Sequence, residues 1–187
     1  MSDSISQQLI ISGVGGQGVL FVTRLLAEAA INKGLPVFTS ETHGMAQRGG
    51  TVLSHFKVGD FSSPLIRPAQ ADGLLVLKAE NLAQHGAFLK SIGWAVVNGG
   101  DDVRPDADHP IDRIDADSLA QEIENPKAVN VILLGFTLAK AEQANKEERL
   151  FCSAADIKTV LENRFGRKQK MLTASLKALD TGYQALD

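Results

Sequence analysis

The chain has 187 residues and a formal net charge of −3 from 19 basic and 22 acidic side chains. This length fits a single domain that buries roughly 70% of the surface of its unfolded chain, and the balanced charge favours neither a nucleic-acid nor an anionic-membrane partner. No apolar run approaches the roughly 20 residues of a membrane span, and Asp3 stands where a signal peptide carries positive charge, so we expect a cytoplasmic protein.

A single cysteine, Cys152, limits the redox and metal chemistry of the chain. An iron–sulfur cluster normally needs about four thiolates and an internal disulfide needs two, which excludes both within this chain alone. The histidines are scattered without the spacing of a metal site, at His43, His55, His85 and His109. We expect no metal bound by this chain by itself, and no catalytic role for the thiol.

The first expected elements are a strand at residues 9–12 and a helix at residues 19–30, joined by a glycine-rich turn. Gly13, Gly15 and Gly18 have the G-x-G-x-x-G spacing, which allows a sharp turn and directs the free N–H groups of the helix towards negative charge. The same turn also serves crossovers that bind nothing, so the motif alone supports a ligand site and an ordinary turn about equally. The candidate binding residues in this turn are Gly13, Gly15, Gly16, Gln17 and Gly18.

A second glycine-rich segment, residues 44–50, follows an expected strand at residues 36–40. The segment contains too much glycine for a crossover helix, and its Arg48 offers forked donors that suit a carboxylate or a phosphate. An ion pair across a subunit interface is an equally supported role for Arg48. The candidate binding residues in and before this segment are Glu41, Arg48, Gly49 and Gly50.

Two residues beside this segment each have two interpretations. Glu41 ends a strand about 20 residues after the glycine turn, where dinucleotide-binding folds place the carboxylate that holds the ribose, but the position is also typical of a turn cap. His43 has the side chain whose pKa lies nearest neutrality and could move a proton, although a histidine in a turn is more often structural. His43 and Arg48 are the candidate catalytic residues.

The middle of the sequence alternates expected strands and helices. We expect a half-exposed strand at residues 51–58, a buried strand at 71–77, a helix at 80–89 and a strand at 93–98. Residues 101–117 carry seven aspartates and two prolines and are predicted to form a solvated excursion.

The last third of the sequence is predicted to be helical. One apolar helix is expected to begin at Asn130 as its N-cap and continue to about residue 148, and another to begin at Ser153. An apolar stripe on a final helix is formed by Leu172, Leu176, Leu179 and Tyr183. The basic residues between the last two helices are more typical of a solvated face than of a site for an acidic protein: Arg164, Arg167, Lys168 and Lys170.

Strands that alternate with helices predict a parallel sheet. We therefore expect residues 1–187 to form a single α/β domain with a doubly wound, mostly parallel, Rossmann-like sheet. The two glycine-rich loops should meet at the carboxyl ends of adjacent strands, where such sheets leave a crevice for ligands.

Two segments carry a resemblance to a known family: Gly-Val-Gly-Gly-Gln-Gly-Val at residues 13–19 and Ser-Glu-Thr-His-Gly-Met-Ala-Gln-Arg-Gly-Gly-Thr-Val at residues 40–52. Together they resemble the gamma subunit or domain of 2-oxoacid:ferredoxin oxidoreductases. The chain length, the second segment and residues 60–72 are most similar to the small beta subunit of the indolepyruvate branch. The resemblance is dense over residues 9–98 and thin after them.

This resemblance implies a multisubunit enzyme that oxidatively decarboxylates a 2-oxoacid, such as indolepyruvate or another aryl pyruvate, and forms an acyl-coenzyme A. It implies that thiamine diphosphate, Mg²⁺ and iron–sulfur clusters belong to a larger partner subunit, which passes electrons to ferredoxin, and that this chain is inactive alone. Coenzyme A would be a co-substrate. From this chain, the N–H groups of Gly15 to Gly18 and the side chain of Arg48 suit a carboxylate or the phosphates of coenzyme A.

Two other functions remain open. A free-standing NAD(P)- or flavin-dependent reductase would use Gly13, Gly15, Gly18 and Glu41 to bind a dinucleotide. A non-catalytic assembly module would use the glycine-rich loops only to pack against the thiamine subunit.

Overall fold

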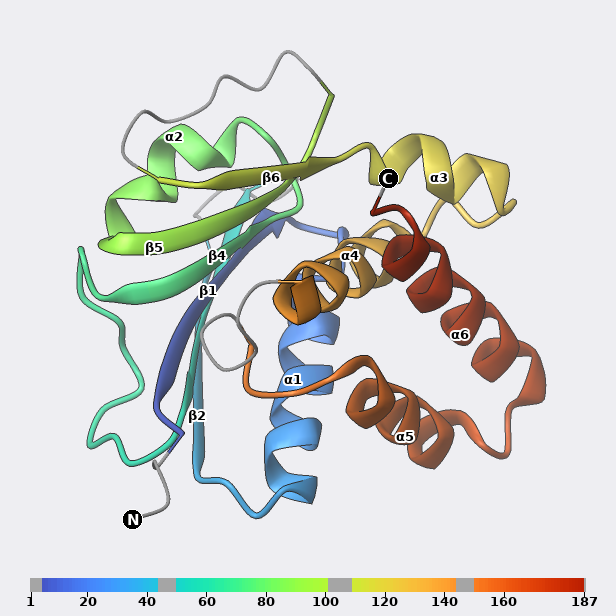
Figure 1. Cartoon of the computed structure of the whole chain (residues 1–187), viewed down its shortest axis with the longest axis horizontal. Coiled ribbons are helices and arrows are strands. Elements are labelled where there is room, and N and C mark those ends of the chain that lie inside the picture. The colour runs from blue at the N-terminus through green and yellow to red at the C-terminus, as the bar shows by residue number, and fades with distance from the viewer. Residues whose placement is uncertain (1–4, 44–49, 101–108, 144–149, 187) are drawn as a thin grey trace.

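The computed structural model describes residues 5–43, 50–100, 109–143 and 150–186, which form one six-stranded sheet with helices on both faces (Figure 1). The strands are β1 (Gln7–Val14), β2 (Val37–His43), β3 (Thr51–Val58), β4 (Ala71–Val76), β5 (Leu89–Asn98) and β6 (Ile111–Ile114). They lie in the order β2-β3-β1-β4-β5-β6. Only β3 runs antiparallel to its neighbours, which confirms the predicted α/β fold with a mostly parallel sheet.

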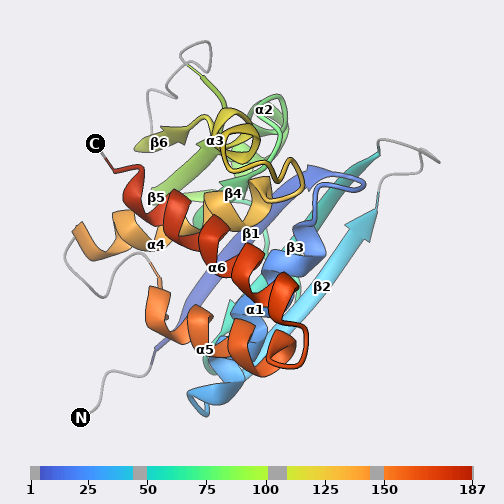
Figure 2. The same cartoon turned by 90° about the vertical axis from the view of Figure 1, so that its right-hand side faces the viewer.

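The helices are distributed unequally over the two faces of the sheet. They are α1 (Val19–Asn32), α2 (Asn81–His85), the 3₁₀ helix η1 (Gly86–Phe88), α3 (Ala116–Glu122), α4 (Val129–Gln143), α5 (Ala154–Phe165) and α6 (Gln169–Gln184). α1, α4, α5 and α6 form a layer on one face, which Figure 2 shows from the front. α2, η1 and the segment 59–70 lie on the other face (Figure 1). Among the described residues, no helix is long and apolar enough to cross a membrane.

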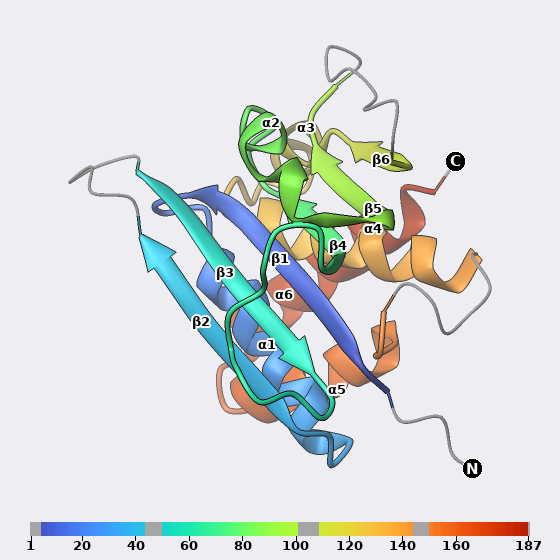
Figure 3. The same cartoon turned by 90° about the vertical axis from the view of Figure 1, so that its left-hand side faces the viewer.

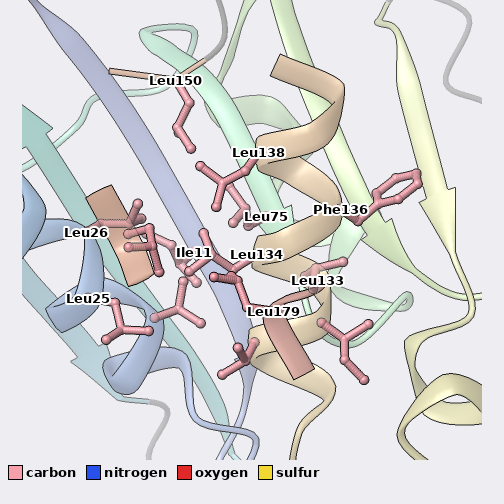
Figure 4. Packing of buried hydrophobic residues seen from close by; sticks show 14 of the residues in the cluster. Ile11, Leu25, Leu26, Leu75, Leu133, Leu134, Phe136, Leu138, Leu150 and Leu179 are labelled. Carbon is pink, nitrogen blue, oxygen red and sulfur yellow. The ribbon is translucent and has the colours of Figure 1, made fainter. Parts of the chain in front are cut away.

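β1 divides its apolar side chains between the two faces of the sheet. Leu9 and Ile11 belong to the main core under the helical layer, whereas Ile10 belongs to a smaller core on the α2 side. Figure 4 shows Ile11 of β1 close to Leu134 of α4, with Leu179 of α6 in the same cluster. Full burial of such a side chain stabilises the fold by roughly 1.5–3 kcal/mol, so this cluster holds the helical layer on the sheet.

The start of α4 corrects one sequence prediction. The apolar helix is present over Val129–Gln143 and is enclosed by the sheet, α1, α3 and α6, but it begins at Val129. Asn130 therefore lies inside the first turn and is not the N-cap. Its side-chain amide donates instead to the carbonyl oxygen of Gly18, at 3.3 Å. Residues 144–149, into which the helix was expected to continue, lie outside the described residues.

The last two helices begin and pack as the sequence predicts. The Ser153 hydroxyl accepts from the Asp156 N–H at 3.3 Å, while the Asp156 carboxylate accepts from the Ser153 N–H at 2.8 Å, which forms a capping box at the start of α5. The apolar stripe of α6 faces the main core through Leu172, Leu176, Leu179 and Tyr183.

Three other predicted elements were wrong in part, because packing overrides the local pattern. Residues 51–58 form a strand that is buried on both faces, since β3 lies between β2 and β1 with α1 on one side and segment 59–70 on the other. The aspartate-rich stretch contains the edge strand β6, and Asp115 caps α3 by accepting from the Ser118 N–H at 3.0 Å. The helix expected at 80–89 ends earlier, because Leu89 begins β5. Residues 101–108 lie outside the described residues.

α4 and α6 cross at two glycines. A methyl group placed on Gly135 would lie 2.2 Å from the carbonyl oxygen of Leu179, and one on Gly182 would lie 1.9 Å from that of Ile132. The two backbones can approach this closely only where neither helix has a side chain.

We expect Gly182→Ala to lower the free energy of unfolding by about 1–3 kcal/mol, because α6 must move away from α4 and loosen the core between them. Urea unfolding followed by circular dichroism measures this change. Gly86→Ala is the matched control, since a methyl group there meets no atom of the described residues within 4 Å and Gly86 already has helical dihedral angles. Equal stability of the two variants would contradict the tight crossing.

Candidate functional site

The chain leaves the sheet in opposite directions after β1 and β4, which are parallel neighbours. α1 follows β1 on one face, and α2 follows β4 on the other (Figure 1). In open sheets, such a reversal leaves a crevice for ligands beyond the carboxyl ends of the strands. A cavity of about 830 Å³ lies at this edge. Its polar lining comes from the ends of four strands and consists of Gln17, Lys78, Glu80, Asn98, Asp115 and Asp117.

The glycine turn after β1 meets the start of β3. The Gly15 N–H donates to the carbonyl oxygen of Gly50 at 3.1 Å, and Val14 pairs with Thr51 in the sheet. The described ends of the two glycine-rich loops are therefore in contact, as predicted. The adjacent strands are β1 and β3, however, because β3 separates β1 from β2.

Gly15 and Gly16 present their backbone to open space. Among the described residues, a methyl group on Gly15 would meet only the carbonyl oxygen of Gly50, at 4.0 Å, and one on Gly16 would meet no atom within 4 Å. α1 begins nearby at Val19, and the first N–H groups of a helix have no intrahelical acceptor. Backbone donors beside open space form a setting that favours an anion.

Gly13 and Gly18 serve contacts inside the chain instead. A methyl group on Gly13 would lie 2.8 Å from a methyl carbon of Val19, and one on Gly18 would lie 2.1 Å from the side-chain nitrogen of Asn130. Gly18 also has a φ of 81°, in the left-handed region that favours glycine. These two glycines are required for packing, whatever binds at the turn.

Gln17 connects the glycine turn to the end of β4. Its side-chain oxygen accepts from the Val14 N–H at 2.9 Å, and its side-chain nitrogen donates to the carbonyl oxygen of Leu77 at 3.2 Å. Asn98 donates to the same Leu77 oxygen at 3.3 Å and to the Asp117 carboxylate at 2.7 Å. This network joins the ends of β1, β4 and β5 to α3 along the wall of the cavity.

A second polar network attaches α2 to the end of β1. The Asn81 side chain donates to the Ser12 hydroxyl at 3.1 Å and to the carbonyl oxygen of Gly13 at 3.0 Å. Since the hydroxyl accepts from Asn81, its own proton is available to His85 Nδ1, which lies 2.7 Å away. Ser12, Asn81 and His85 are all buried, so these bonds fix the position of α2 relative to the glycine turn.

Two buried histidines lie on the α2 side of the sheet. His55 Nδ1 accepts from the Ile66 N–H at 3.1 Å and so holds segment 59–70 against β3. Burial lowers the pKa of His55, and the charge of Lys57 lowers it further. Burial likewise lowers the pKa of His85, with a smaller contribution from His55. Both side chains are neutral at physiological pH.

The structure places only some of the residues of the second glycine-rich segment. Glu41 is exposed on β2 and pairs with Ser54 of β3, whose partner on the other side is Ile11 of β1. A dinucleotide fold needs its carboxylate on the strand next to β1, so Glu41 does not occupy the position predicted for a ribose ligand. The backbone of His43 ends β2. The side chain of His43, together with Arg48 and Gly49, lies outside the described residues.

Three asparagines that hold the site together were missed by sequence reasoning: Asn81, Asn98 and Asn130. Each lies at the start of a helix or the end of a strand, where asparagine is common for local capping. The backbone carbonyls to which they donate lie 68, 21 and 112 residues away in the sequence, so no local pattern identifies them.

Cys152 belongs to the main core, and burial raises the pKa of its thiol. A thiol that stays protonated is a poor nucleophile and a poor metal ligand. Within the described part of the chain, no group of three or more histidine, cysteine, aspartate or glutamate side chains is placed to hold a metal ion.

Gly18→Ala should destabilise the chain by about 1–3 kcal/mol, because the methyl group would displace Asn130 and strain a left-handed residue. In an Asn130→Ala background, the same change should cost only the backbone strain of about 1 kcal/mol, since the side-chain nitrogen and its carbon are gone. Urea unfolding of the two single variants and the double variant measures this coupling. Additive effects would show that Gly18 and Asn130 do not compete for space.

The free energy of unfolding should decrease as the pH falls below 6.5, the ordinary pKa of histidine. The folded-state pKa values of His55 and His85 are lower than this, so the unfolded chain binds more protons in that range. The contribution of the two histidines to the free energy of unfolding is fully present above pH 6.5. It is lost as the pH falls through their folded-state pKa values. Urea unfolding between about pH 8 and pH 5 measures the slope. The double variant His55→Asn, His85→Asn should flatten it, and an unchanged slope would contradict the assignment.

Comparison with known proteins agrees with this fold. The profile of the family described as pyruvate ferredoxin/flavodoxin oxidoreductase matches residues 8–185. Indolepyruvate oxidoreductase subunit IorB of Archaeoglobus fulgidus is 29% identical over an alignment 204 positions long, which covers 94% of this chain and 92% of that protein.

Solved structures show the same arrangement. Pyruvate oxidoreductase subunit PORC from Thermotoga maritima has a TM-score of 0.75 at 25% identity, and the match covers 96% of each chain. The 2-oxoglutarate:ferredoxin oxidoreductase from Magnetococcus marinus has a TM-score of 0.74 at 24% identity, with 97% of this chain covering 32% of that longer one. The resemblance predicted from the two glycine-rich segments is thus confirmed: the chain belongs to the pyruvate ferredoxin/flavodoxin oxidoreductase family.

Proposed function

We propose that this chain is the small subunit of an indolepyruvate-type 2-oxoacid:ferredoxin oxidoreductase. The complex would oxidatively decarboxylate an aryl 2-oxoacid, form an acyl-coenzyme A and pass the electrons to ferredoxin. The observation that carries the proposal is the similarity, along nearly the whole chain, to indolepyruvate oxidoreductase subunit IorB. The family match over residues 8–185 spans both glycine-rich segments, whose described ends are in contact.

The larger subunit of this complex would hold thiamine diphosphate, Mg²⁺ and the iron–sulfur clusters. The one cysteine of this chain is buried in the core, and its raised pKa does not fit a cluster ligand. Thiamine diphosphate supplies the decarboxylation chemistry when bound. This chain's own part would be to position an anionic group, either the 2-oxoacid carboxylate or the phosphates of coenzyme A.

The anion would lie against the backbone of Gly15 and Gly16, in front of the N-terminus of α1. Among the described residues, open space at both glycines and the absence of a side-chain cap at the start of α1 support this placement. Gly50 lies beside them through its hydrogen bond with Gly15. Arg48 would add a forked, charge-assisted donor, with Gly49 allowing close approach and His43 available for a proton.

The strand order does not favour the alternative function, an NAD(P)- or flavin-dependent reductase, with which the glycine spacing alone is compatible. Glu41, the carboxylate that the reductase would use to bind the ribose, lies on β2, and the antiparallel β3 separates β2 from β1.

The first experiment is anaerobic purification of the chain from its native cells, together with whatever copurifies. We expect a larger thiamine- and iron-containing subunit, and a complex that reduces an electron acceptor with indolepyruvate in preference to pyruvate or 2-oxoglutarate. Preference for one of the latter would reject the indolepyruvate branch. Isolation of the chain alone with a bound dinucleotide would reject the proposal as a whole.

Gly15→Val tests whether the turn contacts a ligand or only a partner subunit. Gly15 does not require a positive φ, and its side-chain direction is open, so we expect the stability of the free chain to change by no more than about 0.5 kcal/mol. In the assembled complex, we expect KM for coenzyme A or for the 2-oxoacid to rise by about ten-fold. Weaker assembly with unchanged KM would instead identify the turn as an assembly contact.

A further inference from the structure

The face of the sheet opposite the main helical layer is only partly covered. In the part of the chain that the structure describes, α2 and η1 lie near β4 and β5, whereas only the segment 59–70 crosses over β2 and β3 (Figure 3). The side chains that β2 and β3 direct to this face are therefore covered by a single layer of chain or by none.

Lys57 of β3 lies on this thinly covered face. Its cross-strand partners are Phe38 of β2 and Gln8 of β1, whose side chains point to the same side of the sheet. Lys57 is only 7% exposed, and its Nζ lies 5.0 Å from the centre of the Phe61 ring. Arg67 is exposed on segment 59–70, and burial together with the charge of Arg67 lowers the pKa of Lys57.

These two cations have no counter-charge in the described chain. Other basic side chains of the protein form ion pairs, for example Lys33 with Asp156 and Lys90 with Asp72. Among the described residues, no carboxylate oxygen lies within 4.0 Å of the charged nitrogens of Lys57 or Arg67. The carbon chain of Lys57 is covered, and its ammonium group is partly removed from water beside a second positive charge, which is unfavourable in the free chain.

Exposed apolar side chains lie beside the two cations. Phe38 is 39% exposed and Leu65 is 53% exposed, on β2 and on segment 59–70 respectively. Aromatic and aliphatic side chains next to an arginine are typical of the central part of a protein–protein interface. We call Phe38, Lys57, Phe61, Leu65 and Arg67 the Lys57 face.

We propose that the Lys57 face docks the larger subunit of the oxidoreductase, and that a carboxylate of that subunit enters the complex beside Lys57 and Arg67. The identity of the partner rests on the proposed function. Docking supplies the missing counter-charge and removes Phe38 and Leu65 from water. The basic cluster between α5 and α6 does not need a counter-charge from a partner. Arg164 already pairs with Glu28, and water solvates the exposed side chains of Arg167, Lys168 and Lys170.

Matched charge reversals test this assignment. Arg67→Glu and Arg167→Glu change the net charge equally, and both residues are exposed, so both variants should fold. We expect Arg67→Glu to raise the Kd for the larger subunit by about ten-fold or more at low salt, and Arg167→Glu to leave it unchanged. Biolayer interferometry with the immobilised larger subunit measures both values. Unchanged affinity of Arg67→Glu, or an equal loss in both variants, would overturn the proposal.

Lys57→Met separates docking from a structural role. The variant keeps the length of the side chain and removes the unpaired charge, so the urea midpoint of the free chain should stay the same or rise, while affinity for the larger subunit falls. A lower midpoint with unchanged affinity would show that Lys57 only supports the fold and would reject the proposal.

Two outcomes distinguish this proposal from the proposed function. If the wild-type chain binds no thiamine-containing subunit, both are rejected. If it binds one in an Arg67-dependent manner but the complex is inactive with indolepyruvate, the docking assignment stands and the substrate is wrong. Sedimentation of the free chain tests whether the Lys57 face binds a second copy of this chain. A dimer that the Arg67→Glu change dissociates would show that it does, and would overturn the proposal.

Discussion

The antiparallel position of β3 between β1 and β2 controls the arrangement at the carboxyl edge of the sheet. It makes the second glycine-rich segment a connection between neighbouring strands and places Gly50 in hydrogen-bond contact with Gly15. It also moves Glu41 one strand away from the glycine turn, which removes the ribose contact that a dinucleotide requires. The same strand carries Lys57 on the thinly covered face. Both the candidate anion site and the proposed docking face therefore depend on one strand insertion.

Sequence patterns identified the elements whose signals are local. The apolar run before the glycines, the helical spacing after them and the helix start at Ser153 each depend on residues within a few positions, and all three are present in the structure. The glycine spacing also indicated a tight turn, and Gly18 has the left-handed conformation that such a turn uses. The contact between the two loops followed from the general rule for parallel sheets, although the strand order differed from the expected one.

The sequence predictions that were wrong or incomplete concern contacts between distant parts of the chain. β3 was expected to be half-exposed because its sequence alternates, but α1 and segment 59–70 cover both of its faces. β6 lies in a stretch rich in aspartate, and its pairing with β5 provides the stability that its composition lacks. Asn81, Asn98 and Asn130 each bond to a backbone carbonyl of another element. Such partners become visible only when the elements are placed in space.

The enclosure of α4 has a consequence for how the protein forms during synthesis. A helix that is apolar around its whole circumference cannot remain in water, and part of its cover comes from α6, which leaves the ribosome later. The nascent chain thus passes through a stage in which the sheet strands exist but the centre of the helical layer is unprotected. Exposed apolar surface of this kind binds chaperones or aggregates, so the final two-glycine contact between α4 and α6 also ends the period in which the chain is vulnerable.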